Sequence, residues 1–184
     1  MSEGKLLIMG TGGCGSGFIW NMFRMCGVET TEHREWMRQG GIRESKDPAN
    51  FPAPKVIKHN GGFLINLQHH IEECQWEVEH VFFATAKLDL AMSIQKSRLR
   101  RRGKEFDRDE QLELYYSKLG KGTAQLIETG FPFTIVRCPD SILHPEYLYE
   151  KMKAFLPNVT YERFLEAHNE LIIPKKRDRL YVHA

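Results

Sequence analysis

Short apolar runs alternate along the chain with longer segments in which apolar residues recur every three or four positions. The runs at residues 5–9 and 79–85 are typical of strands buried on both faces, and the longer segments are typical of helices packed by one side. The pattern predicts strands at residues 5–9, 28–31, 55–59, 79–85 and 132–137, and helices at residues 18–26, 63–76, 88–99, 107–129, 146–156 and 161–169. Strands that alternate with helices predict an α/β fold, a three-layer sandwich with a mostly parallel central sheet.

Parallel strands carry their ligands at their carboxyl ends. The loops that follow Met9, His59, Thr85 and Arg137 are therefore expected to share one crevice. A second glycine cluster, Gly120 to Gly122, follows a polar helical pattern instead of a strand, so it predicts a helix break and not a ligand site.

Length and composition limit the class of protein. A chain of 184 residues predicts a single domain over residues 1–184, and 41% hydrophobic with 27% charged residues is ordinary for a folded protein. A net charge of +2 gives no reason to expect nucleic acid as a partner, and no apolar run is long enough for a membrane span. The four cysteines are scattered without zinc or disulfide spacing, which favours a cytoplasmic protein with no bound metal.

The strongest chemical signal is a glycine-rich loop between the first predicted strand and helix. Glycines allow successive backbone N–H groups to turn toward an anion, and a following helix adds the positive end of its dipole. The loop therefore predicts a phosphate-binding site made of Gly10, Thr11, Gly12, Gly13, Cys14, Gly15, Ser16 and Gly17.

Two known loop types share part of this spacing. A Walker A loop would have Lys and Ser or Thr where this chain has Ser16 and Gly17, so the usual cation and Mg²⁺ ligand of a kinase are missing. A dinucleotide loop would need an acidic residue at the end of the second strand, for which Glu29 and Glu32 are candidates. An NAD-type protein is therefore one alternative.

At three segments the chain resembles the sulfotransferase family, a branch of the P-loop fold. Residues 8–18 are similar to the family's 5′-phosphosulfate loop, residues 81–93 to its strand, loop and helix that hold a nucleotide 3′-phosphate, and residues 131–156 to its last strand and helix. The resemblance implies a P-loop domain that binds 3′-phosphoadenosine-5′-phosphosulfate without metal. It adds Asp89 and Ser93 to the nucleotide site, because both match the second motif.

The same resemblance implies a transferase that moves a sulfuryl group from the nucleotide to an unknown small-molecule or glycan acceptor. Lys58 and His59 end the third predicted strand, where His59 would be the base and Lys58 would supply positive charge. Gly13 and Thr85 stand where the family has basic residues. A nucleotide-binding protein that has lost catalysis is therefore a second alternative.

Overall fold

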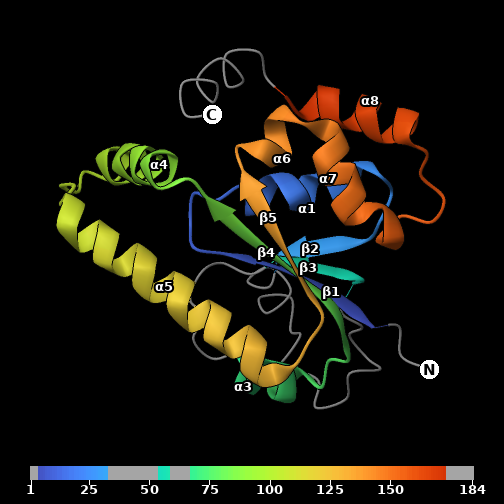
Figure 1. Cartoon of the computed structure of the whole chain (residues 1–184), viewed down its shortest axis with the longest axis horizontal. Helices are drawn as coiled ribbons and strands as arrows, with labels where there is room; N and C mark the ends of the chain where they lie inside the picture. The colour runs from blue at the N-terminus through green and yellow to red at the C-terminus, as the bar shows by residue number, and fades with distance from the viewer. Residues whose placement is uncertain (1–3, 33–53, 59–66, 173–184) are drawn as a thin grey trace.

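The computed structural model describes residues 4–32, 54–58 and 67–172. Its strands are β1 Lys5–Gly10, β2 Thr30–Glu32, β3 Val56–Lys58, β4 Val78–Ala86 and β5 Phe133–Cys138. They form one sheet in the order β2-β3-β1-β4-β5, and every neighbouring pair is parallel. The predicted parallel α/β fold is confirmed, with β1 at the centre of the sheet (Figure 1).

In the described ranges, helices lie between β1 and β2, between β3 and β4, between β4 and β5, and after β5, as the sequence pattern predicts. They are α1 Ser16–Met25, α3 Leu67–Cys74, α4 Leu88–Arg101, α5 Arg108–Thr129, α6 Asp140–Leu143, α7 Pro145–Met152 and α8 Tyr161–Leu171, with a 3-10 turn η3 at Lys153–Phe155. Two details were not predicted. The short helix α6 follows β5 directly, and the expected helix at residues 146–156 ends at Met152 and continues as the 3-10 turn.

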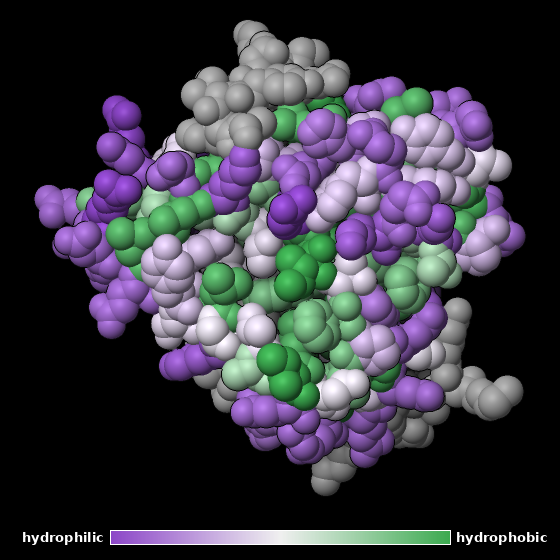
Figure 2. Space-filling model, in the orientation of Figure 1, coloured by the Kyte–Doolittle hydropathy of each residue, from purple (hydrophilic) through white to green (hydrophobic). Residues whose placement is uncertain are grey.

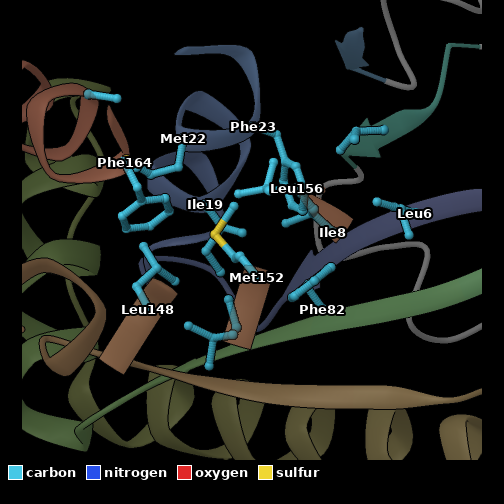
Figure 3. Close-up of a cluster of buried hydrophobic side chains, with 14 of the residues drawn as sticks. Leu6, Ile8, Ile19, Met22, Phe23, Phe82, Leu148, Met152, Leu156 and Phe164 are labelled. Atoms are coloured by element: carbon cyan, nitrogen blue, oxygen red, sulfur yellow. The ribbon is translucent and has the colours of Figure 1, made fainter. Parts of the chain in front are cut away.

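One face of the sheet is covered by α1, α7 and α8. Alternate residues of β1, Leu6 and Ile8, point to this face together with Phe82 of β4 (Figure 3). They pack against buried side chains of the three helices, which include Ile19, Met22, Phe23, Leu148, Met152 and Phe164. This cluster fixes the position of α1, the helix that begins at the glycine loop.

The opposite face is covered by α3 and α5. Leu7 and Met9 of β1 point to it, with Val81 and Phe83 of β4, and Leu126 of α5 packs on them. Helices therefore lie on both faces of the sheet, which confirms the three layers. The edge strand β5 leaves Phe133 and Ile135 partly exposed on this side. Figure 2 shows exposed apolar atoms near the middle of the face drawn, surrounded by hydrophilic ones.

The expected break at Gly120 and Gly122 does not occur, and that prediction was wrong. Helix α5 runs without interruption over 22 residues. Asp107 caps its start by accepting hydrogen bonds from the amides of Asp109 and Glu110, and Gly130 ends it in the left-handed conformation. A helical glycine costs about 1 kcal/mol relative to alanine, which a long, capped helix packed on a sheet can offset.

Within the described ranges, no helix combines the length and the hydropathy that a membrane crossing would need.

Candidate functional site: the glycine loop

The loop leaves the sheet at Gly10, a position with no room for a side chain. A Cβ there would lie 2.2 Å from Cys14 Sγ and 2.8 Å from the carbonyl oxygen of Ala84. Gly10 pairs in register with Ala84 of β4, so the chain must turn while it is still pressed against the neighbouring strand. Glycine is required here for close packing.

Three glycines then bend the loop into the start of α1. Gly12, Gly13 and Gly15 have φ of 92°, 67° and 84°, a region that residues with a side chain rarely adopt. Gly15 is the residue before α1, and no side chain caps the helix there. No acidic residue occupies the first turn either. The first amide groups of α1 and the positive end of its dipole are therefore left for an outside anion.

The loop lies between the elements that follow β4 and β5. A Cβ on Gly13 would lie 3.0 Å from Cγ2 of Ile94 in α4, and one on Gly15 would lie 3.3 Å from Cβ of Cys138 at the end of β5. The segments that follow β1, β4 and β5 therefore lie close together, and the expectation that they share one ligand crevice stays a prediction. The segment after His59, which was expected to join them, lies outside the described residues.

Cys14 and Cys138 fill the base of the loop. Both thiols are buried. Burial, with smaller contributions from Cys14 and Asp140, raises the pKa of Cys138 to about 12, so this thiol stays protonated. Cys14 lies under Gly10, so it serves the packing of the loop and does not present its thiol to a ligand.

The structure explains why position 13 carries no basic residue. A lysine or arginine there would need both a left-handed backbone and space that Ile94 occupies. The glycine is therefore part of how the loop packs on α4, and the loop itself provides no fixed cation.

Asp89 and Ser93, expected at the nucleotide, lie on α4 but away from the loop. The residues of α4 that contact the loop are at positions 91, 94 and 95. With about 100° of rotation per residue, positions 89 and 93 lie on roughly the opposite side of the helix. Both side chains are exposed. The structure does not bring these two residues together with residues 10–17.

Lys58 ends β3 in register with Ile8, and it turns toward α1. Its Nζ lies 5.6 Å from the ring centroid of Trp20, and the guanidinium of Arg24 lies 5.4 Å from the same ring. Lys58 is therefore held beside the middle of α1. His59, the predicted base, lies outside the described residues.

Several residues beside the loop were not predicted as functional. Thr11 is 3% exposed, and its hydroxyl has no hydrogen-bond partner among the described atoms. It lines a small hollow with Gln95 of α4 and with Gln111, Tyr115 and Lys118 of α5. The signal in the sequence was weak: Gln111 is a polar residue at an inward position of an otherwise amphipathic helix.

The order of the strands does not support the dinucleotide alternative. In the dinucleotide-binding fold the second strand, which carries the acidic residue, lies next to the first. Here β3 lies between β1 and β2, so Glu32 at the end of β2 and Glu29 just before its start lie two strand positions away, about 10 Å in strand spacing. They are too far across the sheet for the role that the dinucleotide spacing assigned to them.

No group of three or more His, Cys, Asp or Glu side chains that could hold a metal ion is found among the residues that the structure describes.

Comparisons with known proteins give no family. No protein-family model and no curated protein matches the chain. Among solved structures, a gluconokinase from Sinorhizobium meliloti 1021 matches over 100% of this chain and 98% of its own, with 13% sequence identity and a TM-score of 0.42. Similarity at this level transfers no activity to this chain.

Proposed function

We propose that residues 10–17 bind a phosphate group of a nucleotide through backbone amides. The observation that carries the proposal is the sequence of left-handed glycines that leads into the uncapped start of α1, at the carboxyl end of a central parallel strand. Such a start offers several N–H donors and about half a positive charge to one anion. At Gly12 and Gly17 the backbone carries no side chain and has almost no neighbouring atoms, so a compact phosphate can approach it.

The charge of the site points to modest affinity. The loop has no lysine, and position 13 has no space for one. Uncharged donors therefore carry the anion, and an Mg²⁺ complex of ATP gains nothing from a loop without the usual hydroxyl ligand at Gly17. A metal-free nucleotide is the better match.

The finer proposal is a sulfotransferase-like transferase, as the resemblance implies. The donor would be 3′-phosphoadenosine-5′-phosphosulfate, which supplies an activated sulfuryl group when bound. His59 would take the proton of the acceptor hydroxyl, and Lys58 would balance charge on the departing phosphate. Asp89 and Ser93 would serve this donor only if its second phosphate reached the far side of α4.

Two observations favour the alternative of binding without catalysis. Lys58 lies over the ring of Trp20, and Gly13 cannot be replaced by a cation without displacing Ile94. A protein of this kind would bind the nucleotide and transfer nothing.

The test is calorimetry with 3′-phosphoadenosine-5′-phosphate, ATP and NAD, each with and without Mg²⁺. We expect the bisphosphate to bind in either condition. Gly12→Asp should abolish this binding, because it places a carboxylate where the anion lies. The matched control is Gly27→Asp, at the other end of α1, where φ is 81° and no atom lies within 4 Å of a Cβ.

The two variants share the backbone strain and differ in distance from the anion. Equal loss of binding in both would contradict the assignment of the site. A preference for ATP with Mg²⁺ would instead indicate kinase chemistry. Sulfate transfer from the donor to a phenol acceptor, measured with wild type and His59→Ala, then separates a transferase from a protein that only binds.

A further inference from the structure

The hollow beside the glycine loop has walls from three elements that meet only in the folded chain. Thr11 comes from the loop, Met92 and Gln95 from α4, and Gln111, Tyr115 and Lys118 from α5. The hydroxyl of Tyr115 donates to the carbonyl oxygen of Ala86 at 2.7 Å, which ties α5 to the end of β4. The walls are therefore fixed before any ligand arrives.

Thr11 is the first sign that the hollow receives a polar group. Its side chain is 3% exposed, lines the hollow and has an Oγ1 without a partner among the described residues. A buried hydroxyl without a partner destabilises the fold, so an occupant that forms a hydrogen bond here recovers much of that cost.

Two further polar side chains around the hollow, Gln95 and Gln111, carry amides. Gln111 is 8% exposed, and Nε2 of Gln95 lies 3.9 Å from where a Cβ of Gly12 would be, so it borders the open side of the loop. A hydroxyl and two amides offer both donors and acceptors. An alcohol hydroxyl, which can donate and accept at once, matches this lining better than a carboxylate or an ammonium.

Size and charge restrict the ligand further. The hollow has space for a group of about one water molecule, so a single hydroxyl enters and the rest of the ligand stays outside. Half-buried Lys118 contributes a positive charge to the same lining. An anionic group close to the hydroxyl would be attracted to it.

We propose that this hollow binds one hydroxyl of a small anionic alcohol, with the anionic group near Lys118. The role of the bound alcohol as the acceptor of a transferred group rests on the proposed transferase function, whereas its binding in the hollow does not.

The probe is glycerol 3-phosphate, compared with propyl phosphate and inorganic phosphate, which keep the charge but lack the hydroxyls. The readout is the ¹³C-methyl NMR signal of Met92, whose side chain lines the hollow. We expect glycerol 3-phosphate to shift this signal and to bind at least about tenfold more tightly than propyl phosphate, because one lost hydrogen bond is worth about 1.4 kcal/mol.

Variants test the same contacts in the protein. Gln111→Leu and Thr11→Val should each weaken the binding of glycerol 3-phosphate at least about tenfold. Gln125→Leu is the control, because Gln125 lies on the same helix and bonds Glu128 outside the hollow. The comparison of the two ligands on the wild-type protein needs no variant to fold.

The titrations are made with and without saturating 3′-phosphoadenosine-5′-phosphate. Equal binding of propyl phosphate, or binding unchanged in both Gln111→Leu and Thr11→Val, overturns the proposal. So does a Met92 signal that glycerol 3-phosphate leaves in place, which means that the hollow holds an ordered water only. A specific shift in a protein that does not bind the nucleotide supports the hollow and contradicts the proposed function alone.

Discussion

Two parts of the glycine loop differ in what surrounds them. At its base, which we define as Gly10, Gly13 and Gly15, a Cβ would meet another atom at 3.3 Å or less. At its open side, Gly12 and Gly17, the closest atom to a Cβ is the Gln95 amide at 3.9 Å from Gly12, and Gly17 has no neighbour within 4 Å. Glycines of the base serve packing, whereas those of the open side leave backbone accessible.

The difference separates two roles that look identical in the sequence. Substitutions at the base should lower the free energy of unfolding because the new side chain collides with its neighbours. Substitutions at the open side should change anion binding, with little effect on stability at helical Gly17 and with only the cost of the left-handed backbone at Gly12. Any base variant that folds normally, or any open-side variant that binds normally, would break this division.

The largest effect is expected for Gly10→Ala. The new methyl group would collide with Cys14 Sγ and the Ala84 carbonyl, so we expect a loss of about 3 kcal/mol or more in the free energy of unfolding. Urea unfolding followed by circular dichroism measures it. Adding Cys14→Ala should recover only part of the lost free energy of unfolding, because the Ala84 carbonyl remains in place. Full recovery would show that this carbonyl does not constrain Gly10.

Gly13→Lys should have the next largest effect, a loss of about 2–3 kcal/mol in the free energy of unfolding. The lysine must adopt a φ of 67°, and its Cβ would lie 3.0 Å from Cγ2 of Ile94, which must move aside. In a double-mutant cycle with Ile94→Ala, measured by urea unfolding, the two changes should cost less together than their sum. Additive losses would mean that Ile94 does not restrict a side chain at position 13.

The third expectation concerns Cys138, which presses on Gly15. Its pKa is raised by burial from 9.0 to about 12, so above pH 9 the unfolded chain loses this proton while the folded chain keeps it. The contribution of Cys138 to the free energy of unfolding is fully present below pH 9 and is lost as the pH rises toward 12. Between pH 8 and pH 10 the wild type should lose about 1 kcal/mol more than Cys138→Ala in urea unfolding. Equal losses would show that the thiol ionises in the fold.

The smallest effect on stability is expected at the open side. Gly17→Ala should leave the free energy of unfolding unchanged or raise it by a few tenths to about 1 kcal/mol, because the position is helical and a Cβ meets nothing within 4 Å. The same methyl group should weaken binding of the bisphosphate in calorimetry. Gly120→Ala is the matched control in α5, stabilising to a similar degree without affecting binding.

The order of strands and helices could be predicted because burial imposes a period on the chain. Apolar runs such as Val81 to Ala84 have both faces covered, and this pattern is visible without a structure. The predicted break in α5 failed because local glycine propensity was outweighed by caps and by packing on the sheet. Segment bounds elsewhere differ by a few residues, since helix and strand ends depend on tertiary contacts.

The loop could be located from its glycines, whereas its surroundings could not. Which glycine faces Ile94 and which faces Cys138 depends on how α4 and β5 approach β1, and no local pattern records that approach. Asp89 and Ser93 were selected by their spacing, yet the side of α4 that meets the loop carries Ile94 and Gln95 instead. The residues of the hollow come from distant segments, so only the folded chain identifies them.

The central position of β1 has a consequence for how the protein folds. Leu6 pairs with Val56 on one side and with His80 on the other, so β1 has no partner nearby in the chain. Closing such long loops costs entropy before any pairing is gained, which makes the sheet a slow, high-contact-order element. Strand β1 can therefore take its place only after β3 and β4 are available, and a nascent chain that has not yet exposed β4 has no anion site.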